Sequence, residues 1–513
     1  MDLHWRTLDL IKFALCLAVI PAIWWTGRQG ARDRVLLPLL IVVGALAYVN
    51  FGTFHSGLRC HSVHYYDMYH YYIGGKYFTE LGYGDLYLAT VVADQDADRF
   101  FDGLDDFTHV RDLRADRLIP WRSAMADSAR VRQLFSEERW RDFKADIVAF
   151  QARMPRGDWE EALCDYGFNP SPVWVLTGGL AARLVSIDSL VGFVALAWLD
   201  NLLMAAAFVL LGRAFGMRVA AFAVFFFGLN FLHRYVHMSG SLLRLDWLAL
   251  LIAGLALLKE RRAVPAGICL GWATMLRAFP ALFLVGIAVC GIARIYRGGA
   301  YINREMRTVL AAGATGLVLF AASLAVPPGW SGWTDFTGNI GYHTKRLTAV
   351  RIAAPYVFMY GGEGSWEEVR EAHGEQGWAA WRYERLRRYE VVLWLLRIAL
   401  LAGFVATCWR CRAWQALALG LVLVWGFANP ARYYWCHLVL LVPLLLAAPR
   451  DGPRPVATAA LFVAMALGFL LHWLEAFLLL QQWVNSMTLG LVLMVAMVLV
   501  WREAGRGEEL ESD

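Results

Sequence analysis

The chain alternates long apolar runs with short, arginine-rich connections. A helix needs about 20 apolar residues to span the hydrocarbon of a bilayer, whereas barrel strands give alternating segments of roughly ten residues. The runs are continuous, so they predict an all-α, polytopic integral membrane protein with about thirteen transmembrane helices. The apolar runs are residues 9–26, 35–53, 172–187, 190–212, 219–236, 243–258, 263–276, 279–295, 308–327, 389–408, 413–428, 432–448, 455–474 and 486–501.

Two long polar segments, residues 54–171 and 328–388, interrupt this pattern. They separate N-terminal transmembrane helices (1–53), central transmembrane helices (172–327), and C-terminal transmembrane helices with a short cytoplasmic tail (389–513). Arginines and lysines cluster in the short connections, and the positive-inside bias assigns those connections to the cytoplasm. Both polar segments then lie on the outer side, where we expect them to build one site together. The first is expected to form a partly helical outer domain.

The two runs that follow the first polar segment cannot both cross the membrane. If the outer segment ends at residue 171, crossing by 172–187 and by 190–212 would leave Arg213 on the wrong side. We therefore expect one of these runs to be short, re-entrant or interfacial. The N-terminal run has no small-residue cleavage site after it, so we expect a retained helix and not a signal peptide.

The composition agrees with a membrane protein. Of the 513 residues, 59% are hydrophobic and 18% are charged, and the mean hydropathy is +0.45, which is too apolar for a soluble multidomain enzyme. The formal net charge of +5 comes mostly from arginines between the apolar runs, so it indicates topology and contact with anionic membrane lipids. We find no basic nucleic-acid motif and expect no nucleic-acid partner.

Asp67 is the first candidate for a functional residue. It follows the second apolar run, within the aromatic-rich stretch of residues 64–77. An ionisable group beside a membrane-spanning helix is costly unless it is paired or used, so it indicates function by default. Aromatic residues near Asp67 and in a later segment are suited to stack on sugars or to line the route of a lipid; alternatively, they anchor helices at the interface. They are Tyr65, Tyr66, Tyr69, Tyr71, Tyr72 and Trp435.

Arg277 is the second candidate, because it lies in an otherwise apolar stretch just before Pro280, which interrupts the helix. A buried arginine there requires an anionic partner, and phosphate matches its planar guanidinium. The alternative is snorkelling to the interface or a pair with a structural carboxylate such as Asp246. A third candidate is the segment 429–437, which joins two late helices on the outer side and is alternatively part of an interfacial aromatic belt.

Cys60 and Cys164 lie at the two ends of the first polar segment. A disulfide between them would close that loop, although two free buried thiols explain the sequence as well. Acidic and histidine residues recur at every third position nearby and make a metal site conceivable: His61, His64, Asp67 and His70. Metal geometry would favour a spacing of three or four on one stripe of a helix, so we expect no metal and no other cofactor.

These residues resemble a known family. Residues 67–77 and 81–87 are similar to the first outer loop of GT-C-type glycosyltransferases, and the closest pattern is that of bacterial polyprenol-phosphate-mannose-dependent mannosyltransferases. Residues 169–172, 245–280 and 429–437 resemble later parts of the same family. In two places the chain departs from the family. Arginine replaces the lysine common at the end of the central block, and the usual Gly-Gln-x-Asn pattern before that block is missing.

The resemblance implies a membrane glycosyltransferase that uses a polyprenyl-phosphate sugar donor and a lipid or glycan acceptor in an outward-facing pocket. Asp67 would take the proton of the acceptor hydroxyl, and a single displacement would invert the anomeric centre. Cations would bind the donor phosphate. The basic candidates are Arg277 and His437, followed by Arg432, Arg244, His343, Lys345 and Arg346.

Other functions remain open from the sequence. A transporter or flippase of a lipid-linked saccharide would line its path with the intramembrane charges, but the chain has one clear proline break and no second copy of it. An O-antigen ligase or polymerase would place the decisive residues in the second outer segment, near 343–351. A structural membrane subunit would tolerate every single polar substitution. In each case we expect a multi-pass protein of the inner (plasma) membrane.

Overall fold

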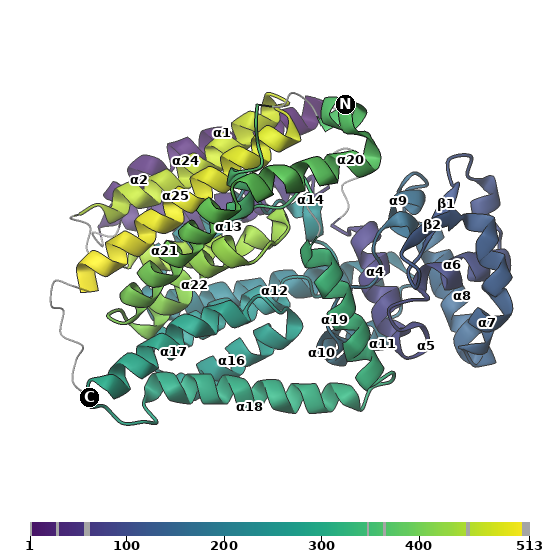
Figure 1. The fold of residues 1–513 in the computed structure, drawn as a ribbon, viewed down its shortest axis with the longest axis horizontal. Coiled ribbons are helices and arrows are strands. Elements are labelled where there is room, and N and C mark those ends of the chain that lie inside the picture. Colours follow the sequence, from purple (N-terminus) through teal and green to yellow (C-terminus); the bar gives the residue numbers. More distant parts are fainter. Residues whose placement is uncertain are drawn as a thin grey trace.

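A bundle of helices and a smaller domain lie side by side in the computed structural model of this protein (Figure 1). The smaller domain is formed by the part of the first polar segment that the structure describes, residues 62–171. Across the described part of the chain, the fold is helical apart from a single two-stranded sheet. The described residues are 3–26, 30–55, 62–345, 348–362, 366–447 and 452–504.

Six helical stretches among the described residues are long and apolar enough to cross a membrane. The first, Trp5–Trp25, comprises α1 (Leu3–Ala18) and α2 (Ile20–Trp25). The structure agrees with an all-α membrane protein, but the predicted count of about thirteen spans is not confirmed. The other five are α12 (Leu190–Phe215), α18 (Arg304–Leu324), α21 (Glu390–Cys408), α24 (Arg454–Trp473) and α25 (Leu478–Ala504).

Most of the other apolar runs form helices that are too short to match a full span. A 14-residue helix such as α16 (Ala263–Leu276) rises about 21 Å, less than the roughly 30 Å of hydrocarbon. It ends because Arg277 is extended, with φ −143° and ψ 137°. The remaining helices of this group are α13 (Met217–Gly228), α15 (Asp246–Lys259), α17 (Ala281–Tyr296), α22 (Ala413–Phe427) and α23 (Leu441–Leu446), which follows the 3₁₀ helix η6 (Arg432–Leu440). Helix α3 (Ala31–Tyr48) has 18 residues, but three of them are charged, at its first turn.

The run 172–187 is divided and does not form one helix. It contains α10 (Pro172–Trp174), the π-helical turn η4 (Val175–Gly179) and α11 (Leu180–Leu184), after which Val185 is extended. The following run forms the full-length α12. Of the two runs that could not both cross the membrane, 172–187 is therefore the short one.

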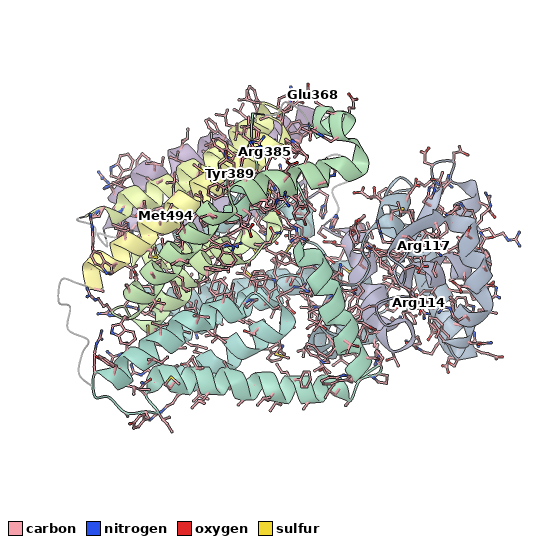
Figure 2. All side chains as sticks on the ribbon, in the orientation of Figure 1. Arg114, Arg117, Glu368, Arg385, Tyr389 and Met494 are labelled. Carbon is pink, nitrogen blue, oxygen red and sulfur yellow. The ribbon has the colours of Figure 1, made fainter. Side chains whose placement is uncertain are left out.

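The outer domain, residues 62–171, places α4 (Tyr65–Lys76) against the bundle. Helix α4 contacts η4 and α11 of the bundle as well as α8 and α9 of its own domain, and most of its residues are buried. Within the domain, Asp85 pairs with Arg130 at 2.9 Å and with Arg114, which Figure 2 labels. The other elements are α5 (Phe78–Leu81), α6 (Leu86–Gln95), η2 (Phe100–Gly103), β1 (His109–Asp112), β2 (Arg117–Pro120), η3 (Trp121–Asp127), α7 (Ser128–Gln133), α8 (Glu137–Gln151) and α9 (Asp158–Cys164), with β1 and β2 antiparallel.

The second polar segment returns to the bundle and pairs with a late loop. The amide of Arg432 donates to the carbonyl of Val350 at 2.7 Å, and the amide of Ile352 donates to the carbonyl of Pro430 at 3.3 Å. The loop between α22 and η6 is therefore fixed by this segment. The remaining elements are η1 (Asn50–Gly52), α14 (Tyr235–Met238), α19 (Trp330–Lys345), η5 (Ala354–Val357) and α20 (Trp366–Arg388).

Helices α16 and α18 approach closely and run parallel. A methyl group at Gly267 would lie 2.4 Å from the Thr308 carbonyl oxygen, and one at Gly271 would lie 2.4 Å from the Ala312 carbonyl oxygen. Small residues allow such an approach between membrane helices. Both helices begin at the arginine-rich end of the bundle, and α16 ends at Arg277.

Candidate active site

Asp67 lies in the first turn of α4, where the helix dipole favours a negative charge. The start of this helix is fixed to an irregular part of the bundle. The amide of His64 donates to the carbonyl of Gly240 at 2.8 Å, and the Tyr235 hydroxyl donates to the carbonyl of Ser62 at 2.7 Å. The outer domain thus presents Asp67 to the segment 239–245 of the bundle.

Arg244 forms a buried ion pair with Asp67. The Nη1 atom of Arg244 lies 2.8 Å from Oδ2 of Asp67, and the two side chains are 6% and 13% exposed. His64 places its Nδ1 atom 3.4 Å from the same oxygen. Burial by itself raises the pKa of the Asp67 carboxyl, but Arg244 and His64 more than offset it and hold that pKa well below its usual value. Asp67 is therefore ionised in the free protein.

Contacts with other parts of the bundle position Arg244. Asp200 of α12 accepts hydrogen bonds from the amides of Arg244 (2.7 Å) and Leu245 (2.9 Å). The indole of Trp174 donates to the carbonyl of Leu243 at 2.9 Å, and Leu243 has a positive φ of 48°. Asp200 is not among the residues predicted from the sequence, although a single acid within an apolar run is a signal for a functional position.

Tyr71 connects the two arginines of the site. Its ring centroid lies 4.3 Å from the guanidinium carbon of Arg244 and 5.8 Å from that of Arg277. The Nη2 atom of Arg277 donates to the Tyr71 hydroxyl at 2.8 Å. Tyr71 is four residues after Asp67, so both side chains lie on the same face of α4.

Both arginines retain unsatisfied donors. Among the described residues, the buried Nε atoms of Arg244 and Arg277 have no hydrogen-bond partner. The alternative pair of Arg277 with Asp246 is not formed within 4.0 Å in this part of the chain. Buried donors without a protein partner are rare in native proteins, so these two Nε atoms can each donate to a further acceptor. The site therefore combines an ionised carboxylate with two guanidinium groups suited to phosphate.

The other tyrosines of α4 point elsewhere. The hydroxyl of Tyr69 lies 2.7 Å from that of Thr90, inside the outer domain. The hydroxyl of Tyr72 donates to the carbonyl of Val185 at 3.2 Å, and that of Tyr66 lies 3.5 Å from the Glu161 carbonyl oxygen. These contacts hold α4 in place, so among the predicted lining residues of this helix Tyr71 is the one that the structure brings to the arginines.

The segment 429–437 brings aromatic rings into this region, and the ring centroid of Tyr433 lies 6.0 Å from the guanidinium carbon of Arg244. His437 is fully buried, and its ring centroid lies 5.6 Å from that of Phe279 and 5.9 Å from that of Trp247. Trp435 is fully buried and donates to the Ile352 carbonyl at 3.0 Å, so it packs in the core and does not line an open surface. The structure records no contact of His437 with the arginines of the site among the residues described.

Some predicted site residues, or their side chains, fall outside the part of the chain that the structure describes. Arg346, Cys60 and His61 lie outside the described residues, and the side chains of His343 and Lys345 in α19 are not described. Cys164 is partly buried, with its thiol 3.4 Å from the His109 carbonyl oxygen, and its pairing with Cys60 stays a prediction. Arg432 is positioned by its amide, as described above. No group of three or more metal-ligating side chains occurs in the described ranges.

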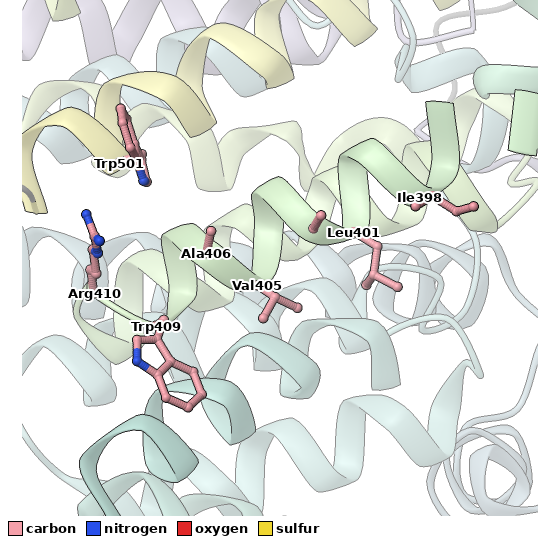
Figure 3. A pocket seen from close by; sticks show the side chains of 8 residues that line it. Ile398, Leu401, Val405, Ala406, Trp409, Arg410 and Trp501 are labelled. Carbon is pink, nitrogen blue, oxygen red and sulfur yellow. The ribbon is translucent and has the colours of Figure 1, made fainter. Parts of the chain in front are cut away.

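A cavity of about 670 Å³ lies elsewhere, between α21 and α25. Figure 3 shows its apolar wall, formed by residues such as Leu401 and Val405 of α21, with Trp501 of α25 across from them. None of the residues that line it is a predicted site residue. Its apolar lining on two membrane-length helices suits lipid chains and not sugar chemistry.

The apolar helices indicate a multi-pass membrane protein, and a buried, charged site lies where they meet the smaller domain. Residues 179–431 match the family model of Glycosyltransferase family 87. This match supports a GT-C-type glycosyltransferase and indicates a membrane glycosyltransferase; it does not favour the transporter or ligase alternatives. No curated protein and no solved structure matches the chain.

The family match covers both arginines of the site but not the carboxylate of Asp67. Asp200, Arg244 and Arg277 lie within residues 179–431, whereas Asp67 precedes them. The role of Asp67 therefore rests on its position in the structure and on the resemblance of the first outer loop.

Proposed function

We propose that this membrane glycosyltransferase moves a hexose or pentose from a polyprenyl-phosphate donor to a hydroxyl of a lipid or glycan acceptor. The pairing of the Asp67 carboxylate with Arg244, next to Arg277 and around one tyrosine ring, is the observation that carries this proposal. A reaction of this kind needs a proton acceptor and cations for a phosphate, and the site supplies both.

In the proposed reaction, the acceptor oxygen attacks the anomeric carbon while the bond from that carbon to the phosphate oxygen breaks. The acceptor proton passes to Asp67, and polyprenyl phosphate leaves with the bonding electrons. A single displacement through an oxocarbenium-like transition state inverts the anomeric configuration. Arg277 and Arg244 stabilise the charge that develops on the phosphate.

The ion pair couples donor binding to the basicity of Asp67. In the free protein, Arg244 lowers the pKa of the Asp67 carboxyl, which makes it a weak base. A donor phosphate that shares Arg244 brings a negative charge near Asp67 and draws the guanidinium toward itself. The pKa of Asp67 then rises toward the value that burial favours, so the base is activated when the donor is present.

We place the protein in the inner (plasma) membrane, with the outer domain on the exterior side. In Figure 1 the arginine-rich ends of α17, α18 and α22 lie away from that domain, and the end of α15 meets them in one cavity, an arrangement that agrees with the positive-inside bias. Mannose is the first sugar to test because of the resemblance of residues 67–77, and glucose and arabinose donors serve as comparisons.

Transfer from a radiolabelled polyprenyl-phosphate sugar by purified protein in liposomes tests this function. We expect Asp67→Asn to insert and fold but to lose about 10²- to 10⁴-fold in turnover, the usual contribution of a general base. Asp96→Asn is the matched control, since this outer-domain carboxylate pairs with Arg132 at 2.7 Å and lies outside the site. Normal turnover by Asp67→Asn would show that Asp67 is not the general base.

A further inference from the structure

The apolar cavity between α21 and α25, which we call the α21–α25 groove, has a volume of about 670 Å³. Its α21 side is formed by residues spaced three and four apart, from Ile398 through Leu401 and Val405 to Trp409. This spacing places side chains on one face of a helix. Leu401 and, across the groove, Trp501 of α25 are exposed. The groove is therefore open toward the surroundings of two membrane-length helices, which are lipid.

The length of the groove matches one leaflet of a bilayer. From Ile398 to Trp409 the chain rises about 16 Å, at 1.5 Å per residue. One leaflet contributes about half of the roughly 30 Å of hydrocarbon. The groove ends at Arg410, two residues after α21 ends at Cys408. A lipid chain that fills the groove would therefore bring its head group to Arg410.

Arg410 is the one charged residue in the lining of the groove, and no carboxylate lines it. In the part of the chain that the structure describes, its guanidinium makes no hydrogen bond or ion pair. Another residue meets the negative end of the α21 dipole, because Nη2 of Arg297 donates to the Trp409 carbonyl at 2.7 Å. Figure 3 shows the guanidinium of Arg410 opposite the indole of Trp501 at this end of the groove.

The charged end of the groove is remote from the candidate active site. Helix α22 begins at Ala413, three residues after Arg410, and leads to the loop whose Tyr433 lies 6.0 Å from Arg244. Its 15 residues correspond to about 22 Å along the axis. A sugar donor with its phosphate at Arg410 would therefore not reach Asp67, so the occupant of the groove is a different lipid.

We propose that the α21–α25 groove binds an anionic phospholipid, with an acyl chain along α21 and the phosphate of its head group at Arg410. The apolar lining cannot select this lipid, because one hydrocarbon chain replaces another with little gain in free energy. Selection therefore comes from the head group. A guanidinium matches the oxygens of phosphate, and the indole of Trp501 supplies an N–H donor beside it. This binding goes beyond the proposed transfer reaction and does not depend on it.

Retention of phospholipids by delipidated protein in neutral detergent tests the proposal. Native mass spectrometry counts the bound lipids and gives apparent Kd values for phosphatidylglycerol and for phosphatidylcholine with the same chains. We expect wild type to prefer phosphatidylglycerol about tenfold, the typical effect of one charge-assisted contact. Arg410→Gln should lose this preference and retain one phosphatidylglycerol fewer. Arg307→Gln is the matched control, because Arg307 is exposed in the first turns of α18 and does not line the groove.

Ala402→Phe tests the groove without touching the charge. Ala402 lines the groove and is exposed, so a phenyl ring there takes the place of a lipid chain and removes no internal contact. It should weaken the binding of both phospholipids at this place several-fold. Leu395→Phe is its control, because Leu395 is exposed on the same helix outside the groove.

Three outcomes would overturn the proposal. The first is unchanged lipid retention in Ala402→Phe, and the second is a preference for phosphatidylglycerol that survives in Arg410→Gln. The third concerns residues 505–513, which include four acids: Glu508, Glu509, Glu511 and Asp513. Binding of phosphatidylglycerol only after removal of these residues would assign Arg410 to the acids of the chain itself. Sugar transfer is not measured here, so failure of this proposal and failure of the proposed function are distinguishable.

Discussion

The Nη1 atom of Arg244, in the helical bundle, lies 2.8 Å from Oδ2 of Asp67, in the outer domain. This contact joins the two parts of the molecule at the place where the chemistry is proposed. Breaking a buried pair by removing one partner typically costs about 3 to 5 kcal/mol, since it leaves an uncompensated charge. Loss of either partner of the Arg244–Asp67 ion pair should therefore lower both the free energy of unfolding and the activity.

The pH dependence of transfer should reveal the pair. Because Arg244 and His64 lower the pKa of Asp67, its carboxyl stays ionised as the pH falls from 8 to 5, and wild-type kcat/KM should show no acid limb from this group. In Arg244→Gln, burial raises the pKa of Asp67, so the carboxyl takes up a proton and activity falls toward acid pH. Profiles of kcat/KM for both proteins check this. Identical profiles in the two proteins would show that Arg244 does not control the ionisation of Asp67.

Tyr71→Phe should weaken donor binding. The substitution keeps the ring beside Arg244 but removes the hydroxyl that accepts a hydrogen bond from Arg277 at 2.8 Å. A hydrogen bond to a charged group contributes about 1.5 kcal/mol or more, so the KM for the donor should rise about tenfold. Tyr69→Phe is the control, because its hydroxyl contacts Thr90 within the outer domain. Equal effects of the two substitutions would contradict the assignment of Tyr71 to the site.

Asp200→Asn should misplace Arg244. Asp200 accepts one hydrogen bond from a backbone amide on each of its two carboxylate oxygens. Asparagine has only one side-chain carbonyl oxygen for these two donors, and it lacks the charge that strengthens both hydrogen bonds. We expect about 1 to 3 kcal/mol of destabilisation and a larger fall in kcat than in donor affinity. Thermal unfolding and steady-state kinetics measure the two effects. Asp188→Asn, at an exposed acid just before α12, should change neither; a wild-type kcat for Asp200→Asn would remove Asp200 from the site.

Thiol labelling tests the orientation in the membrane. Cys164 lies at the end of α9 in the outer domain and is partly buried, so an impermeant thiol reagent should reach it slowly and only from the exterior, and only after reduction if it is paired with Cys60. A cysteine introduced at Arg297, after α17, should react only from the cytoplasmic side. Intact and inverted vesicles provide the two measurements. The reverse pattern would invert the topology proposed here.

The sequence pointed to Asp67, Arg244 and Arg277 as candidates, and the structure brings these three side chains together around Tyr71. The sequence was not sufficient to place the breaks in the helices. Residues 243–245 read as part of an apolar run, yet α15 begins only at Asp246, since the preceding backbone bonds to Trp174 and Asp200. Those partners are distant in the sequence, so a local pattern cannot reveal them.

The selection of tyrosines shows a different limit. Helical periodicity alone places Tyr71 on the face of Asp67 and turns Tyr69 and Tyr72 away from it, so this distinction was available from the sequence. The role of the late loop, residues 429–437, was not available from the sequence, because its polar residues His437 and Trp435 are buried among aromatic rings. The predicted count of spans is not confirmed for a related reason: helices of 12 to 16 residues and longer ones have the same local apolar pattern.

The course of α15 bears on the choice of assay conditions. One end of this helix adjoins the residue that contacts Asp67, and the other end lies in a cavity rich in cations. Phosphate ions, or detergents with anionic heads, would be attracted to Arg244 and Arg277, the groups proposed to hold the donor phosphate. Kinetic work on this enzyme should begin in a neutral, phosphate-free medium, with the ions added back one at a time.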